Sequence, residues 1–141
     1  MNILISACLL GQYCRYDGQT KVYPQVQALL GRDDIHLIPV CPEQCGGLAT
    51  PRPAAERQGK RVVTTNGSDV TAQYQRGAEA ALYWARLFHC TKAILKEKSP
   101  SCGHGQIYDG TFSRTLTVGD GVTAALLRAE GLEIIGESDL P

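Results

Sequence analysis

The chain has 141 residues, 43% of them hydrophobic and 20% charged, and its 14 basic residues balance its 14 acidic ones. This composition is typical of one globular domain over residues 1–141, and the neutral charge argues against a nucleic-acid partner. The longest apolar stretch, residues 3–10, is shorter than the about 20 residues that cross a bilayer and has no secretory-signal pattern, so we expect a cytoplasmic protein without a membrane partner. These totals leave the oligomeric state open.

The first half of the chain predicts a strand, a helix and a second strand. Apolar runs with β-branched residues predict buried strands over residues 2–9 and 35–41. Apolar residues at helical spacing predict a helix over residues 22–30, ending before Gly31. Residues 44–61 carry two prolines and several glycines, which favours a long loop, and loops of that length are often functional.

The second half continues the alternation. A long amphipathic helix is predicted over residues 70–88, with Ser68 or Asp69 as its cap, and it leads into a strand over residues 93–95. A last helix begins near Val122 and precedes a strand over residues 132–135.

Alternating strands and helices predict a fold of the α/β class. We expect an open, mostly parallel, Rossmann-like sheet with helices on both faces and right-handed crossovers. In such sheets, ligands bind outside the carboxyl ends of the strands. The functional site is therefore expected at that edge.

Three cysteines follow predicted strands: Cys8, Cys41 and Cys102. Their thiols are expected to meet at the carboxyl edge of the sheet, where three thiolates would make an iron or zinc site with one open position. The alternative is packing, because free cysteines are often buried for that reason alone.

The spacing of the cysteines bears on the type of metal. Zinc sites usually show C-x2-C pairs, and the nearest pairs here are Cys41 with Cys45 and Cys8 with Cys14. A 4Fe-4S cluster fits better because the spacing of its cysteine ligands varies. Pieces of the signature of zinc-dependent base deaminases also occur, but this chain lacks the paired P-C-x-x-C of that signature, so we set this hypothesis aside.

Several motifs follow one another along nearly the whole chain. They lie within residues 6–11, 14–18, 41–53, 96–103 and 119–123, and include Cys-Pro-Glu, Thr-Pro-Arg-Pro and Ser-Pro-Ser-Cys-Gly. Together they resemble the thiouracil desulfidase (TudS) family. The resemblance implies a small α/β enzyme with a 4Fe-4S cluster on three cysteines, whose fourth iron takes the sulfur of a thiolated pyrimidine.

The resemblance also implies a set of ligands. Position by position, it puts the cluster on Cys8, Cys41 and Cys102. Cys45 stands where the family more often has a small apolar residue, which makes it a bystander or a backup ligand. Cys14 is a weaker rival, and Cys90 is assigned to packing.

The implied reaction replaces sulfur with oxygen in a base of the 2-thiouracil or 4-thiouracil type, without net electron transfer, and sulfide leaves on the free iron. Such a hydrolysis needs a group that acts as both base and acid. Glu43 is our candidate, because Pro42 directs it toward the same sheet edge as Cys41. Ser99 and Ser101 are candidates for orienting the water or holding a substrate carbonyl.

The remaining candidates are residues that would bind the substrate or lie beside the cluster. Charged side chains could hold the polar edges of a pyrimidine or offset the negative charge of the cluster, namely Arg15, Asp17, Arg52 and Lys96. Gly47 and Gly103 would let the backbone come close. The competing hypothesis is a cysteine-rich metal-binding or redox-sensing protein without catalysis.

Overall fold

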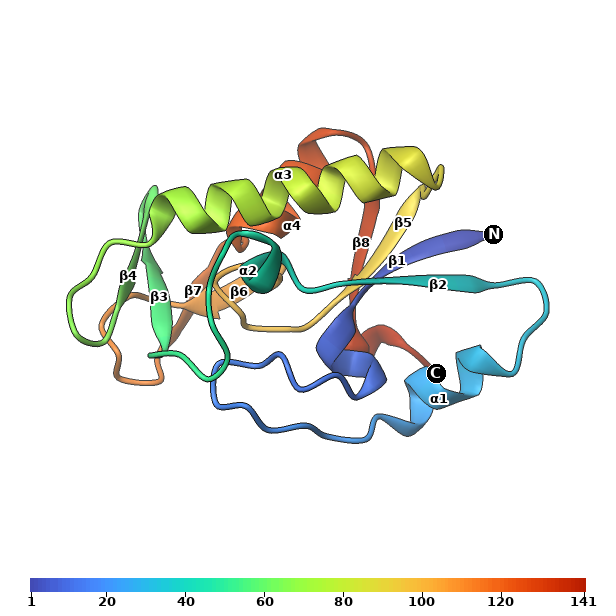
Figure 1. Cartoon of the computed structure of the whole chain (residues 1–141), viewed down its shortest axis with the longest axis horizontal. Coiled ribbons are helices and arrows are strands. Elements are labelled where there is room, and N and C mark those ends of the chain that lie inside the picture. Colours follow the sequence, from blue (N-terminus) through green and yellow to red (C-terminus); the bar gives the residue numbers. More distant parts are fainter.

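A four-stranded parallel sheet forms the centre of the computed structural model, which describes residues 1–141 (Figure 1). Its strands, in spatial order, are β2 (His36–Val40), β1 (Asn2–Ser6), β5 (Lys92–Leu95) and β8 (Glu133–Gly136). All three neighbouring pairs are parallel. The predicted α/β class and parallel sheet are confirmed.

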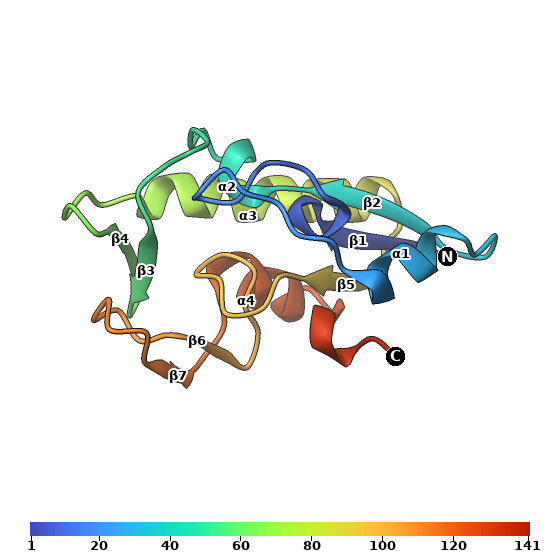
Figure 2. The same cartoon turned by 90° about the horizontal axis from the view of Figure 1, so that it is seen from below.

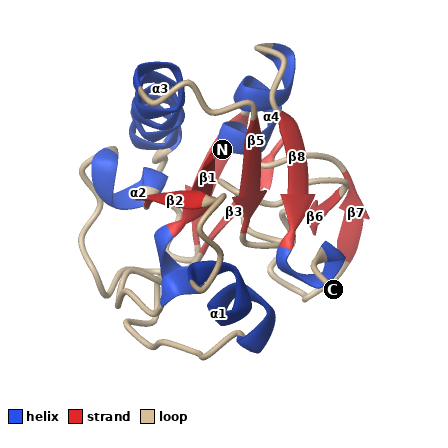
Figure 3. Cartoon of the chain, turned by 90° about the vertical axis from the view of Figure 1, so that its right-hand side faces the viewer, coloured by secondary structure: helices blue, strands red, loops and turns tan.

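Helices cover both faces of this sheet (Figure 3). They are α1 (Pro24–Leu30), α3 (Thr71–Leu87) and α4 (Val122–Ala129). Side chains alternate across a strand, so Leu4 of β1 joins the core beneath α3 and α4, whereas Ile3 and Ile5 join the core beneath α1. None of the helices has the length and apolar character needed to span a bilayer.

Two segments differ from their predicted structure. The first strand ends at Ser6, and residues 7–10 form a 3-10 turn, η1 (Ala7–Leu10). The loop predicted over residues 44–61 contains β3 (Ala55–Gln58) and overlaps the end of α2 (Pro42–Cys45) and the start of β4 (Arg61–Thr64). These elements have four residues each and carry polar side chains, so neither a helical nor an alternating apolar period reveals them.

The start of α3 also differs from the prediction. Val70 occupies the N-cap position, and neither Ser68 nor Asp69 does. Asp69 directly precedes this N-cap residue. Its carboxylate accepts a hydrogen bond at 2.9 Å from the amide of Thr71, the first residue of α3.

Two antiparallel hairpins lie beyond the carboxyl ends of the parallel strands (Figures 1 and 2). One is β3–β4, and the other pairs β6 (Gln106–Tyr108) with β7 (Leu116–Val118). After β8 the chain makes a short turn, η2 (Glu137–Asp139). The hairpins therefore stand over the edge of the sheet where a ligand site was expected.

Candidate functional site

Three thiols gather at the carboxyl edge of the sheet. Cys8 lies in η1 directly after β1, Cys41 is the N-cap residue of α2 directly after β2, and Cys102 lies in the loop after β5. All three line one cavity of about 410 Å³. The structure thus brings together the three cysteines that the strand directions predicted would meet.

A fourth thiol, that of Cys14, lines the same cavity and is buried. It lies within hydrogen-bonding reach of the thiols of Cys8 and Cys41, and these contacts lower the pKa of Cys8 and raise that of Cys14. The pKa of Cys41 is lowered to about 7, against the opposing effect of burial. The hydrogen bond with the Cys14 thiol lowers it most, and the backbone amide of Gln44 and the guanidinium of Arg52 lower it further. Cys14 is therefore the neighbour that favours thiolates at Cys8 and Cys41.

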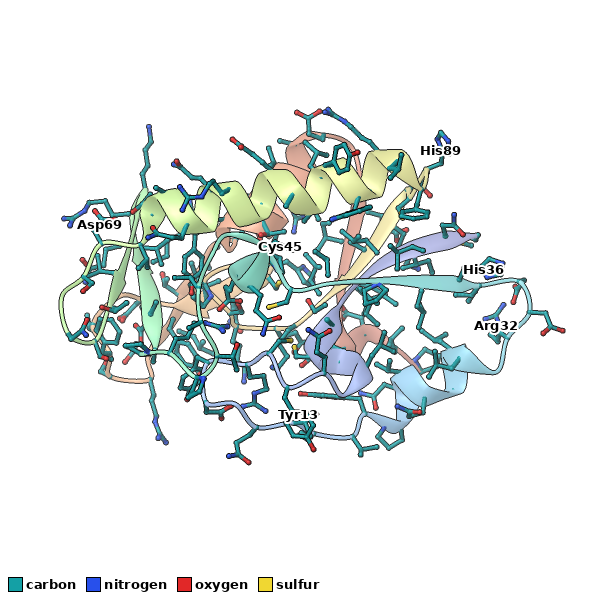
Figure 4. All side chains as sticks on the ribbon, in the orientation of Figure 1. Tyr13, Arg32, His36, Cys45, Asp69 and His89 are labelled. Carbon is teal, nitrogen blue, oxygen red and sulfur yellow. The ribbon has the colours of Figure 1, made fainter.

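The remaining cysteines differ in their surroundings. Burial raises the pKa of Cys102, although Ser6 opposes it through a hydrogen bond. Cys45, the backup ligand, is labelled in Figure 4 at the end of α2. It is exposed and does not line the cavity. Cys90 is buried in the core beneath α3 and α4, in agreement with a packing role. The geometry therefore favours Cys41 over Cys45 at the second position.

Glu43 lies in the cavity wall with a buried cation beside it. Its Oε2 accepts hydrogen bonds from Arg52 Nη2 at 2.8 Å and from the Tyr74 hydroxyl at 3.2 Å. The side chain of Arg52 is 7% exposed and that of Glu43 is 15% exposed. An ion pair this well shielded holds its geometry better than a surface pair.

Arg52 also joins separate loops. Nη2 donates to the carbonyl oxygen of Cys14 at 3.0 Å, and Nη1 donates to Thr50 Oγ1 at 3.1 Å and to the carbonyl oxygen of Ala49 at 3.2 Å. Its Nε is buried without any hydrogen-bond partner. Unpartnered buried donors are rare in proteins, so this atom points to a group that the polypeptide does not supply.

The two candidate serines have different positions. Ser99 lines the cavity, and its Oγ accepts hydrogen bonds from the amides of Ser101 and Cys102, at 3.0 and 3.1 Å. Ser101 is fully buried outside the cavity, where its hydroxyl pairs with Thr123 Oγ1 at 2.9 Å. Ser101 thus ties the loop to α4, and its Oγ also accepts a hydrogen bond from the Cys102 thiol at 3.9 Å. Of the two candidate serines, only Ser99 lines the cavity.

The charged candidates also differ in whether they line the cavity. Arg15 and Lys96 line the cavity, whereas Asp17 does not and instead contacts Arg15 at 3.4 Å. Lys96 Nζ lies 3.0 Å from Glu137 Oε2. Burial works against its charge, but this hydrogen bond and the carboxylate charge leave the pKa of Lys96 raised, so Lys96 remains cationic.

The two glycine candidates lie outside the cavity lining. At Gly47, which has φ +97°, an added Cβ would meet nothing within 4 Å, so its backbone conformation is what favours glycine. At Gly103 an added Cβ would lie 2.7 Å from the carbonyl oxygen of Ser99. Gly103 therefore allows the tight loop that carries Ser99 and Cys102.

Comparison with known proteins assigns the chain to a family. Residues 3–139 match the family model of 2-thiouracil desulfurase. The chain belongs to the 2-thiouracil desulfurase family. A solved structure named as a 4Fe-4S-dependent thiouracil desulfidase, TudS, is 51% identical, with a TM-score of 0.91 over 99% of this chain and 93% of that one. The uncharacterized protein YbbK of Bacillus subtilis (strain 168) is 42% identical over 148 residues, covering 98% of this chain and 97% of the relative.

The cavity of this member of the 2-thiouracil desulfurase family suits a cluster. No three His, Cys, Asp or Glu side chains converge closely enough to hold a single metal ion. The thiols instead lie around the cavity, each after a different strand. This arrangement is compatible with a cube, in which each thiolate binds a different iron. The unpartnered Arg52 Nε adds a buried donor beside Cys41, which suits an anionic, sulfur-rich group.

Several cavity residues escaped the sequence-based prediction. They are Cys14 as a contact of two thiols, Tyr74, and the hairpin residues Glu56, Phe112 and Arg114. Tyr74 shares the apolar period of α3, which gives no sign of a functional hydroxyl. Phe112 and Arg114 lie in a non-periodic turn, where both have positive φ values of 56° and 60°. For such turn residues the sequence offers no spacing signal.

Proposed function

We propose that this protein is an iron-sulfur enzyme that cleaves a carbon-sulfur bond, exchanging the sulfur of a thiolated pyrimidine for oxygen. The observation that carries the proposal is the gathering of Cys8, Cys41 and Cys102 around one cavity with the carboxylate of Glu43. Family membership and the solved relative, which is named as a 4Fe-4S-dependent thiouracil desulfidase, support it. We assign these three cysteines as ligands of a 4Fe-4S cluster, with Cys14 as a hydrogen-bonding neighbour.

The chemistry is a hydrolysis without net electron transfer. When bound, the cluster supplies an open iron for the thiocarbonyl sulfur, which makes the ring carbon electrophilic. Water forms the new carbon-oxygen bond and the carbon-sulfur bond breaks, so thiouracil and water give uracil and hydrogen sulfide. We assign Glu43 to take a proton from the attacking water and return it to the ring nitrogen or the leaving sulfur.

Ser99 is assigned to hold the substrate. Its oxygen already accepts two backbone hydrogen bonds, so its single hydroxyl proton is free to be donated. A ring carbonyl of the pyrimidine is a suitable acceptor. Ser101, whose hydroxyl pairs with Thr123, is given no catalytic part.

The cations of the cavity are assigned to the polar edges of the substrate. Arg15 and Lys96 each line the cavity and are held by a carboxylate, Asp17 and Glu137 respectively. A cavity of about 410 Å³ lies within the range of small-molecule sites, roughly 300 to 1,000 Å³. A single thiolated pyrimidine is a suitable occupant beside a cluster.

We also infer that the enzyme acts in the cytoplasm. All six cysteines are free, as expected in a reducing compartment, and a cluster with an open iron would be damaged in an oxidising one. We propose no nucleic-acid or membrane partner.

The test is anaerobic purification followed by assay with 2-thiouracil. We expect a brown protein with equal amounts of iron and acid-labile sulfide, which releases uracil and sulfide. Glu43→Gln should keep its iron and lose turnover, because it removes the group that moves the proton. A colourless protein with stoichiometric zinc and no sulfide release would contradict the proposal and favour the metal-binding or redox-sensing alternative.

A further inference from the structure

The two carboxylate oxygens of Glu43 have different surroundings. Oε2 accepts hydrogen bonds from both Arg52 and Tyr74. Oε1 accepts none from the protein. Arg52 Nε is the only side-chain polar atom that is both buried and without a partner. Since Oε1 also has no partner, it is accessible to solvent. Because Glu43 lines the cavity, Oε1 is the oxygen open to a reactant.

Tyr74 reaches Glu43 because α2 and α3 touch through their main chains. A Cβ added at Gly77 of α3 would lie 1.9 Å from the carbonyl oxygen of Pro42, and one added at Gly46 would lie 1.9 Å from that of Gln73. No side chain separates the helices at either point. Pro42 precedes Glu43 and Gln73 precedes Tyr74, so this contact brings the carboxylate and the phenol together.

The Tyr74 hydroxyl makes one hydrogen bond, and its acceptor is Glu43. The ring is buried, 3% exposed, and joins Val62 and Val70 in a small apolar cluster. Phenylalanine would fill that cluster equally well, so packing does not explain the hydroxyl. Burial and the charge of Glu43 raise the pKa of Tyr74, which keeps the phenol protonated as a donor.

We propose that Tyr74 is a positioning residue that, together with Arg52, fixes which oxygen of Glu43 handles the proton. With Oε2 occupied by two donors, Oε1 takes the proton from the attacking water and returns it to the substrate. The inference rests on the acid-base role of Glu43 in the proposed function. It adds that Tyr74 acts only through Glu43 and does not contribute to building the cluster site.

Kinetics of the reconstituted holoenzyme with 2-thiouracil test this role. Tyr74→Phe should keep wild-type iron, sulfide and KM, while kcat falls about tenfold or more, because a charge-assisted hydrogen bond is lost. The double variant Tyr74→Phe with Glu43→Gln should be no slower than Glu43→Gln alone. Tyr83→Phe removes an exposed hydroxyl from the same helix and should leave kcat unchanged.

An infrared measurement gives a readout that does not depend on turnover. The difference spectrum between wild type and Glu43→Gln identifies the carboxylate stretching band of Glu43. Tyr74→Phe should shift that band, and Tyr83→Phe should not.

The outcomes separate the inference from the proposed function. A Tyr74→Phe variant with wild-type kcat and an unshifted band, beside a slow Glu43→Gln, overturns the positioning role alone. Loss of iron in Tyr74→Phe would also overturn it. So would a double variant that is slower than Glu43→Gln by the same factor by which Tyr74→Phe alone is slower than wild type. A fully active Glu43→Gln would instead contradict the acid-base role in the proposed function, and the inference with it.

Discussion

The parallel sheet and the pair of hairpins contribute different parts of the cavity. The sheet brings thiols from distant parts of the chain together because its strands run in the same direction, and Cys8, Cys41 and Cys102 all follow strand ends. The hairpins contribute no thiol. They contribute other residues of the cavity wall, such as Glu56, Tyr108 and Phe112. The proposed cluster ligands therefore depend on the sheet, whereas the hairpins shape another part of the cavity wall.

The hairpins are stabilised differently from the sheet. Glu56 of β3 accepts hydrogen bonds from the amides of Gly110 and Phe112, at 2.9 and 3.2 Å, and Gln58 donates to the carbonyl oxygen of Gly110 at 2.9 Å. These polar contacts join the two hairpins to each other, and a small apolar cluster that includes Val62 packs β4 against α3. The sheet instead packs through two larger apolar clusters beneath the helices. The two regions should therefore respond separately to substitution.

The largest effect should follow from removing a sheet-end thiol. Cys8→Ala, Cys41→Ala and Cys102→Ala should each lose the iron and acid-labile sulfide measured after anaerobic reconstitution, because each removes one proposed ligand. Cys45→Ala and Cys90→Ala are the matched controls and should retain both, since neither residue lies in the cavity. Retention of the cluster in Cys41→Ala with loss in Cys45→Ala would place the second ligand on the exposed thiol.

A large loss of stability should follow from Gly77→Ala. The added Cβ would lie 1.9 Å from the carbonyl oxygen of Pro42, so α2 and α3 must separate. We expect the free energy of unfolding, measured by urea denaturation, to fall by about 3 kcal/mol. Gly31→Ala, where the nearest atom is 3.8 Å away and φ is −82°, should change it by less than about 0.5 kcal/mol. Equal effects at both glycines would contradict the close contact.

A local effect should follow from Glu56→Ala in the hairpins. The change leaves the amides of Gly110 and Phe112 without their acceptor, a cost of about 1 to 3 kcal/mol. Hydrogen exchange should accelerate over residues 106–118 while β1 and β5 keep their protection, and KM for 2-thiouracil should rise with iron content unchanged. Glu79→Ala, an exposed change on α3, serves as the control. Faster exchange throughout the sheet would show that the two regions are not separate.

The smallest effect should come from Asp69, an exposed residue that joins β4 to the first turn of α3. Hydrogen bonds from the Thr71 side chain and amide, with a further one from Arg61, lower its pKa from 3.8 to about 2. A carboxyl whose pKa is lowered in the folded state stabilises above its unfolded pKa and loses that contribution as pH falls. The difference in urea midpoint between wild type and Asp69→Asn should therefore be small at neutral pH and vanish between about pH 4 and pH 2. A difference that grows on acidification would contradict this assignment.

The sheet and its three strand-end thiols were predictable from the sequence because their signals are local. β1, β2, β5 and β8 are short apolar runs, and parallel strands necessarily end at a common edge. Cys14 was underestimated because it lies in a loop without periodicity. Its contact with two other thiols depends on how that loop folds, which the spacing of the cysteines along the sequence does not indicate.

The hydrogen bonds of Glu43 could not be predicted from the sequence either. Its place after Cys41 made it a candidate, but its hydrogen bonds to Arg52 and Tyr74 depend on α2. This helix has only four residues, too few for a helical period to predict it. Ser99 and Ser101 are equivalent in sequence, flanking Pro100. Only the folded loop directs one hydroxyl into the cavity and the other toward Thr123.

The direct contact between α2 and α3 also bears on redesign of this scaffold. Because Gly46 and Gly77 leave no space for a side chain, the position of Glu43 is set by the main chain and not by neighbouring side chains that mutation could exchange. Libraries aimed at bulkier thiolated compounds should vary Phe112 and Arg114 in the hairpin turn. Residues 42–46 and 73–77 should be kept constant, so that the cavity wall is reshaped while the carboxylate stays in place.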